Sequence, residues 1–201
     1  MRLIFTIMLG TLILQACGGT SGLQRGNYPP VGKKDDFILC HGYGCSVKTA
    51  AYFTPQEWKA LTKLFKNDAP NAAEERERIG EALARMEAII GPRTRTEKDL
   101  ARTPITRDKN YETQLDCIDE TVNTDRYLRF LAAEGFLKFH KLGRPVFRGN
   151  PFKGFYPHNS ASLIELETDE IYVVDSWVVD NGEVPDIRPL SGWLKTKYRD
   201  L

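Results

Sequence analysis

Cys117 has the sequence surroundings of a reactive thiol. The stretch "QLDCIDETVNT" places it directly after Asp116, a favoured N-cap residue, so the thiol falls in the first turn of an expected helix. Backbone N–H groups at a helix start have no intrahelical partner, and the helix dipole is positive there. Both effects favour the thiolate, and we therefore expect a lowered pKa for Cys117.

A cysteine nucleophile needs a base, and the base needs a group that orients it. Of the three histidines, His41 lies between two nearby cysteines and His140 lies between two lysines. His158 instead opens the strand-like stretch "HNSASLIEL", at a strand end of the kind where sites are commonly built. Asp175 closes the apolar run "IYVVD" and is the first candidate for the orienting group.

The register of the expected hairpin leaves a second aspartate open for that role. A tight turn centred on residues 168–169 would place His158 opposite Val179 rather than Asp175. The slip of four residues is about 13 Å along a strand. Asp180 is then the alternative partner, unless a bulge or an earlier, longer loop moves Asp175 back toward the histidine.

Three short motifs in this order resemble a known family: "DCIDETVNTDRYLRFLAAEG", "HNSASLIEL" and "YVVDSW". They are similar to the transglutaminase-like branch of the papain-like cysteine peptidases, above all to the bacterial transglutaminase-like cysteine proteinases. The resemblance covers about residues 111–180 and departs from the family pattern after the second aspartate and after the histidine. It implies a papain-like α+β fold and a triad of Cys117, His158 and Asp175, and its spacing favours Asp175 over Asp180.

The resemblance also implies acyl transfer through a thioester on Cys117. The backbone N–H of Cys117 and the side chain of Gln114 would stabilise the oxyanion. Water would then give a peptidase or amidase, whereas an amine would give a crosslink, and the sequence does not choose between them. The substrate is expected to be a peptide or an envelope polymer, and no cofactor or metal is expected. The alternative is a non-catalytic envelope lipoprotein that uses the same fold for binding or assembly.

The first residues have the pattern of an export signal. Arg2 precedes an apolar run over residues 3–14, and Ala16 supplies a small residue before Cys17. The apolar run is too short to span a bilayer, which needs about 20 residues. We therefore expect a signal peptide over residues 1–16.

The end of that signal, "LQAC", resembles the lipobox of bacterial lipoproteins. The resemblance implies that Cys17 carries lipid, such as palmitate, and anchors the chain to a membrane of the bacterial envelope. Gly18 rather than aspartate follows, which by the pattern of such lipoproteins indicates the outer membrane, and we expect the domain to face the periplasm. A plain secretory signal with a chance cysteine is the alternative.

The expected compartment is oxidising, so the other three cysteines can form disulfides there. Cys40 and Cys45 bracket "HGYG", whose two glycines permit a tight loop, and they are the natural disulfide pair. Cys117 is then an odd cysteine that is intermolecular, buried or reactive. Pairing of Cys117 with either of the others is one alternative. A metal site at Cys40, His41 and Cys45 is another, although it lacks a second ligand pair at zinc spacing.

Helices followed by strands are expected to position these residues. Capping signals and apolar spacing predict helices over residues 54–65, 72–90 and 117–134, the second ended by Gly91 and Pro92, with its charged residues facing solvent. The strand-like segments that follow are "FLKFHKL", "PVFRG", "NSASLIEL" and "IYVVDSWVV". This order indicates an α+β fold with helices packed on a small antiparallel sheet.

The rest of the chain sets the domain limits. Residues 17–36 are rich in Gly, Pro and polar residues and are expected to form a lipidated flexible tether, and residues 37–201 suit a single domain. The chain has 28 Lys and Arg against 27 Asp and Glu. Such a balance indicates no nucleic-acid partner. The sequence does not indicate an oligomeric state.

Overall fold

The computed structural model describes residues 28–103, 111–150 and 155–196 of the 201-residue chain. The expected signal peptide and Cys17 lie outside these residues. In chain order the elements are β1 (Phe37–His41), β2 (Val47–Ala51), α1 (Pro55–Leu61), a 3-10 turn η2 (Thr62–Phe65), α2 (Ala72–Thr94), a second 3-10 turn η3 (Tyr111–Thr113), α3 (Cys117–Ala133), β3 (His140–Leu142), β4 (Val146–Asn150), β5 (Phe155–Glu165), β6 (Ile171–Asp175), β7 (Asp186–Pro189) and α4 (Leu190–Trp193).

The strands form two antiparallel sheets. In the larger sheet β5 is central: β6 pairs along its middle, β3 pairs with its last residues, and β4 pairs with its first residues. β7 then pairs with β6. The expected α+β arrangement with a small antiparallel sheet is therefore confirmed. The β1–β2 hairpin, which forms the second sheet, was not among the predicted strands.

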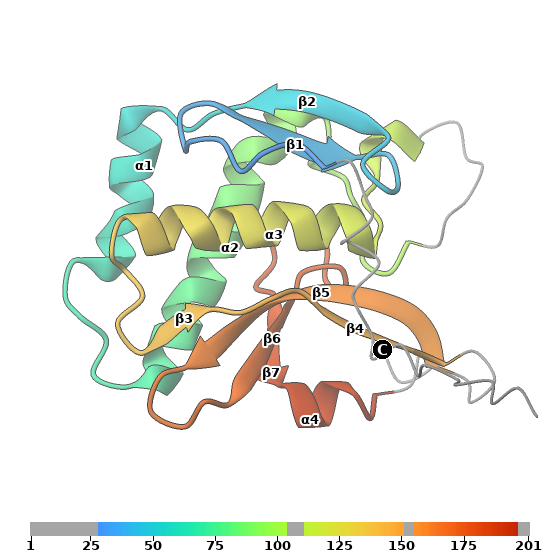
Figure 1. Ribbon diagram of the computed structural model, residues 1–201. Coiled ribbons are helices and arrows are strands. Elements are labelled where there is room, and N and C mark those ends of the chain that lie inside the picture. The colour runs from blue at the N-terminus through green and yellow to red at the C-terminus, as the bar shows by residue number, and fades with distance from the viewer. Residues whose placement is uncertain (1–27, 104–110, 151–154, 197–201) are drawn as a thin grey trace, which may run out of the picture.

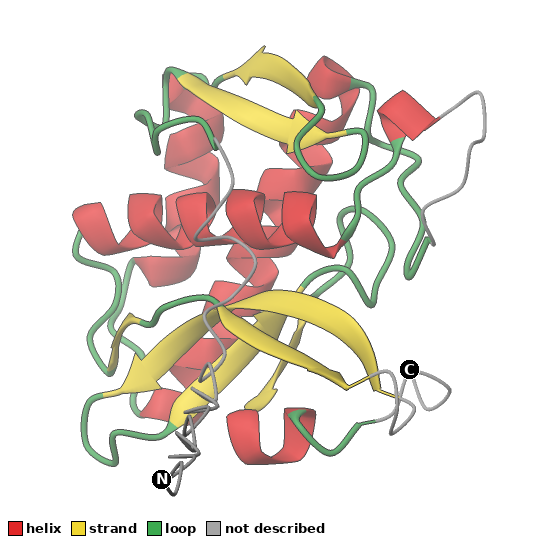
Figure 2. Cartoon of the chain, turned by 45° about the vertical axis from the view of Figure 1, so that its right-hand side comes forward, coloured by secondary structure: helices red, strands yellow, loops and turns green. Residues whose placement is uncertain are grey.

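The helix that begins at Cys117 lies in the middle of the molecule. Figure 1 shows α3 between the β1–β2 hairpin and the larger sheet, with α2 crossing behind it. Figure 2 shows the same layers from a view turned by 45°. Both helices bury apolar side chains, each of which contributes roughly 1.5–3 kcal/mol when fully buried. The most deeply buried of them are Ile79, Leu83, Met86, Ile90, Leu128 and Leu131.

The helix starts agree with the capping signals of the sequence, but one helix end does not. Thr54 and Asn71 cap α1 and α2 as predicted. The expected stop at Gly91 and Pro92 is wrong, because α2 continues to Thr94 with Pro92 inside its last turn. Pro92 removes only the hydrogen bond that its N–H would make to the carbonyl of residue 88, and the Thr94 hydroxyl donates to the carbonyl of Ile90 at 3.1 Å near the helix end.

Two charged residues of α2 are buried, although the sequence predicts that the charged residues of this helix face solvent. Glu75 and Glu87 are both buried. Glu75 accepts the N–H of Lys138 at 2.7 Å and lies 2.8 Å from Nδ1 of His140, while Arg76 lies 3.1 Å from Nε2 of the same ring. This buried network ties α2 to the start of β3.

Residues 28–36, which the sequence places in the tether, contact the domain. The Arg126 guanidinium on α3 donates through Nε to the carbonyl of Val31 at 3.0 Å. The carbonyl of Lys34 accepts the N–H of Phe53 at 2.8 Å. The chain is thus attached to α3 from this N-terminal segment onward.

Candidate functional site

His158 and Asp175 are in direct contact. Nε2 of His158 lies 2.8 Å from Oδ2 and 3.0 Å from Oδ1 of Asp175. The two residues are only 2% and 1% exposed. A carboxylate only accepts hydrogen bonds, so Nε2 is assigned the hydrogen and Nδ1 is left with the lone pair. Within the described part of the chain, this Nδ1 is a buried atom without a hydrogen-bond partner.

The hairpin between β5 and β6 explains the contact. Ile164 pairs with Ile171, and Ala161 pairs with Val174, so the turn is longer and centred earlier than the tight turn at 168–169 that the sequence suggested. The same register sets Asp175 opposite position 160. A residue two positions earlier on β5 faces the same side of the sheet, so His158 is a diagonal neighbour within reach of Asp175.

Two tryptophan rings enclose the imidazole. The ring of Trp177, which follows β6, lies 4.9 Å from the ring of His158, and the ring of Trp193 in α4 lies 5.4 Å from it. Nε1 of Trp193 donates to Oδ2 of Asp175 at 2.7 Å. The sequence does not reveal Trp193 as a site residue, because nothing in the polar segment "SGWLKTKY" links it to a site more than 15 residues upstream.

Cys117 is the first residue of α3, and Asp116 is its N-cap, as predicted. The Asp116 carboxylate accepts the N–H of Ile118 at 3.0 Å and of Asp119 at 2.9 Å. Cys117 is a free, half-buried cysteine. Its sulfur is hydrogen-bonded by the backbone and side chain of Asn159, the residue that follows the histidine. The start of α3 and the start of the β5–β6 pairing therefore meet at this thiol.

The pKa of Cys117 is higher in the structure than the sequence predicts. Burial raises the pKa of this thiol to about 11, and the carboxylates of Asp116 and Asp175 add to the effect. The hydrogen bonds from Asn159 lower it but do not compensate. The predicted fall in pKa is thus wrong, because desolvation and neighbouring negative charge outweigh the helix start. At neutral pH the residue is a thiol, and it needs a base to react.

The Cys40–Cys45 disulfide is present and shapes the loop beside Cys117. The four residues from Gly42 to Cys45 all have positive φ angles, between 60° and 75°. The N–H of Gly42 donates to the carbonyl of Gln114 at 2.9 Å, and the next three N–H groups donate to side-chain carboxyl groups at the start of α3. Tyr43 donates to Asp119 at 2.8 Å and Cys45 donates to the same carboxyl group at 2.6 Å. The disulfide loop is therefore fixed to the first turn of α3.

Two of the predicted candidates are engaged elsewhere. The side chain of Gln114 donates to the carbonyl of Lys98 at 3.1 Å and accepts the N–H of Leu100 at 3.2 Å. Its amide thus holds the 98–100 loop and is not free to stabilise an oxyanion.

Asp180 accepts the N–H of Ala101 at 2.7 Å, and Asp175 is the aspartate that contacts the imidazole.

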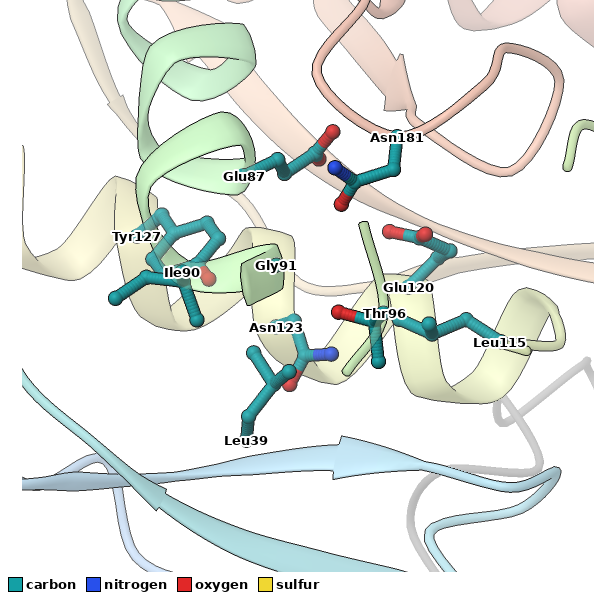
Figure 3. Close-up of a pocket in the computed structure, with 10 residues that line it drawn as sticks. All are labelled: Leu39, Glu87, Ile90, Gly91, Thr96, Leu115, Glu120, Asn123, Tyr127 and Asn181. Atoms are coloured by element: carbon teal, nitrogen blue, oxygen red, sulfur yellow. The ribbon is translucent and has the colours of Figure 1, made fainter. Parts of the chain in front are cut away.

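A small pocket behind α3 contains carboxyl groups that sequence reasoning missed. Figure 3 shows the side chains of Glu87, Glu120 and Asn181 directed toward one another, from α2, from α3 and from the segment after β6. The cavity is about 10 Å³, enough for about one water molecule. Burial raises the pKa of Glu87 to about 8, and it raises the pKa of Glu120 well above the usual value. Oε1 of Glu87 has no hydrogen-bond partner among the described residues.

Metal ligands and membrane spans were also sought in the ranges that the structure describes. There, no group of three or more His, Cys, Asp or Glu side chains is arranged to hold a metal ion. The helices in those ranges include none that is long and apolar enough to cross a membrane. Comparisons of the chain with models of protein families, with curated proteins and with solved structures found no match.

Proposed function

We propose that the protein is a cysteine hydrolase or acyltransferase in which Cys117, His158 and Asp175 act together on a carboxamide. The observation that carries the proposal is the state of the His158 ring. Asp175 holds Nε2, and Nδ1 is buried without a partner. An unpaired buried acceptor costs about 1–3 kcal/mol and calls for an explanation such as a catalytic role.

Among the described residues Nδ1 of His158 has no hydrogen-bond partner, so the thiol of Cys117 is not hydrogen-bonded to the ring, and the two residues are linked through Asn159. Asn159 hydrogen-bonds the sulfur of Cys117 and is the chain neighbour of His158. Catalytic hydrogen bonds are often long in a protein without its substrate and tighten when the substrate binds. A thiol with its proton in place and a base with a free lone pair are the two partners that acyl transfer requires.

The reaction would then proceed in two steps. As Sγ of Cys117 attacks the carboxamide carbon, its proton passes to Nδ1 of His158, and the new C–S bond gives a tetrahedral oxyanion. The C–N bond breaks, the amine leaves with the proton from His158, and a thioester remains on Cys117. Water or a second amine, activated by the same imidazole, resolves the thioester. Asp175 keeps the imidazole in one tautomer and stabilises its protonated form.

The oxyanion would be stabilised by N–H donors close to the sulfur. The backbone N–H of Cys117 lies at the start of α3, where the first N–H groups have no partner in the helix. Asn159 supplies a second candidate, since its backbone and side chain already hydrogen-bond the sulfur. It takes the place of Gln114, whose amide is occupied.

The finer fold and the location belong to the same proposal. The central helix that begins with the nucleophile and packs on the sheet that carries the histidine supports a papain-like arrangement. The signal over residues 1–16 and Cys17 supports a lipid-anchored protein of the bacterial envelope, at the outer membrane and facing the periplasm, with a peptide or envelope polymer as substrate.

A second candidate function is binding or assembly without catalysis. The raised pKa of Cys117 favours it, because a thiol that stays protonated is a poor nucleophile. The two candidates differ in what the imidazole does for the thiol, and this difference can be measured.

The test is the rate at which iodoacetamide, itself a small carboxamide, labels Cys117 at pH 7, with the labelled residue identified by peptide mapping. With a thiol pKa of about 11, labelling depends on help from a base. We expect His158→Ala and Asp175→Asn to slow labelling at least about 10-fold, a threshold set below the roughly 100- to 10,000-fold that general-base catalysis typically contributes. Asp180→Asn is the matched control and should leave the rate unchanged. Equal rates in the wild type and in His158→Ala would refute the catalytic proposal and favour the binding function.

A further inference from the structure

A hollow beside α3 has no role in the chemistry proposed above. Its volume is about 160 Å³, comparable with a cavity of about 150 Å³ that accepts benzene in another protein. Five apolar or aromatic residues from the N-terminal segment, from α3 and from the position just before β4 line it: Tyr28, Pro29, Val31, Val122 and Pro145.

The polar residues that complete the lining are already bound within the protein. The Thr121 hydroxyl donates to the carbonyl of Cys117 at 2.5 Å. Asp125 pairs with Arg129 at 2.7 Å, and Arg126 donates to the carbonyl of Val31 at 3.0 Å. Because these groups are engaged, the surface that the hollow offers to a ligand is mainly apolar, so it suits an uncharged side chain rather than an ion.

The hollow begins one helical turn from the candidate nucleophile. Thr121 and Asp125 follow Cys117 at four-residue intervals, and residues at this spacing lie on one face of a helix, about 5–6 Å apart between Cβ atoms. Tyr28, in the N-terminal segment, lines the same hollow. One or two residues of an extended peptide, at about 3.3 Å each, bridge that distance.

We propose that this hollow, lined by Tyr28, Val31 and Val122, receives an aliphatic side chain of the substrate next to the carbonyl that Cys117 attacks. The inference rests on the proposed acyl transfer and adds its specificity: a peptide-like substrate with a branched aliphatic residue beside the scissile carboxamide. The last part of the expected tether, from Tyr28 onward, thereby forms one wall of the substrate site, fixed there by Arg126.

Chloromethyl ketones of acetyl-leucine and acetyl-glycine test the inference, because both present the same carbonyl to Cys117 and differ in the side chain. In the wild type, the leucine reagent should label Cys117 at least about 10-fold faster than the glycine reagent, as expected when burial of an aliphatic side chain adds binding energy. Val122→Phe fills the hollow and should bring the ratio of the two rates close to one. Val184→Phe is the matched control: Val184 is exposed, lies against Gly80 on α2 and should leave the ratio unchanged.

The outcomes separate this inference from the proposed function. If iodoacetamide labelling depends on His158 but the leucine and glycine reagents react equally in the wild type, the hollow is not the substrate pocket and the catalytic proposal stands. If labelling does not depend on His158, the catalytic proposal is wrong, and the pocket inference that rests on it is wrong as well.

A binding experiment does not need the thiol. In Cys117→Ala, acetyl-leucine amide should shift the NMR methyl signals of Val31 and Val122, and acetyl-glycine amide should not. Unchanged signals would overturn the inference.

Should Val122→Phe not fold, Val122→Ala enlarges the hollow and should raise the relative rate of an acetyl-phenylalanine reagent, and an unchanged rate would count against the pocket.

Discussion

The carboxylate of Asp175 is held by two donors of different kinds, the imidazole of His158 and the indole of Trp193. Both donors lie in a buried setting, and the indole ring also packs against the imidazole. Arg148 stacks 4.4 Å above that indole and donates to the carbonyl of Trp193 at 2.8 Å, so α4 is fixed to the sheet at this point. A side chain near the end of the described chain therefore positions the group that orients the candidate base.

Trp193→Phe removes the indole N–H but keeps an aromatic ring, so it tests the hydrogen bond separately from the ring packing. The ring contact with His158 should persist, but Asp175 loses one hydrogen bond, which for a charged acceptor contributes about 1.5–3 kcal/mol. We expect the free energy of unfolding in urea to fall by that amount and the labelling rate of Cys117 to drop. Trp177→Phe is the control, because Nε1 of Trp177 has no hydrogen-bond partner among the described residues. Equal losses in both variants would show that packing, and not the hydrogen bond, matters.

The sequence predicts the roles of some site residues but not of others. Cys117 and Asp175 could be selected because each lies at the end of an element that its own neighbours define. His158 was selected because it opens the pattern "HNSASLIEL", but β5 begins three residues earlier, at Phe155, so the predicted strand start is wrong. The contact of Trp193 with Asp175 depends on where α4 folds back, and no local pattern encodes this. The pKa of Cys117 could not be predicted either, since the helix start is visible in the sequence but the burial and the nearby carboxylates are not.

At the scale of elements, the first turn of α3 is joined to the β1–β2 hairpin by backbone donors. Asp119 accepts N–H groups from Tyr43 and Cys45 of the disulfide loop and also the N–H of Asp116 at 3.2 Å. The capping signal at Asp116 predicts the helix start, yet it gives no sign that a loop more than 70 residues earlier binds there. Likewise the β5–β6 strands were predicted but their register was not, because it depends on the length of the turn between them.

Asp119→Asn should weaken this junction. An asparagine presents an NH₂ group to one of the N–H donors of the loop, which leaves a buried donor unsatisfied at a cost of about 1–3 kcal/mol. The loss should appear as a lower urea midpoint with the slope of unfolding unchanged. Asp125→Asn, six residues further along α3, breaks only a partly exposed pair with Arg129 and should cost less than about 1 kcal/mol. A smaller effect at position 119 than at 125 would contradict the role of the loop contacts.

At the scale of the whole molecule, buried carboxyl groups connect α2, α3 and the segments beside β6. Glu87 accepts the N–H of Gly182 at 3.1 Å, and Asp99 accepts the N–H of Leu115 at 2.7 Å. Negative charge on one of these groups disfavours charge on the others, so Asp99 raises the pKa of both Glu87 and Glu120. Such groups are stable in the interior when they keep their protons.

The stability of the protein should therefore fall as the pH rises. The pKa of Glu87 is raised from 4.5 to about 8 in the folded protein, so between these pH values the unfolded chain has released a proton that the folded chain retains. The contribution is complete below about pH 4.5 and is lost as the pH approaches 8, with a slope of at most about 1.4 kcal/mol per pH unit for one carboxyl group. The pKa of Asp99, raised to about 7, adds a loss in an overlapping range.

Glu87→Gln tests whether this buried carboxyl carries the effect, because glutamine keeps the shape of the side chain and cannot ionise. Urea unfolding between pH 5 and pH 8 should show a flatter dependence on pH than in the wild type, and the variant should gain relative stability toward pH 8. Glu81→Gln, on the exposed face of the same helix, should leave the slope unchanged. An unaltered slope in Glu87→Gln would mean that the protons are held elsewhere and that the pocket of Figure 3 does not link α2 to α3 through its charge.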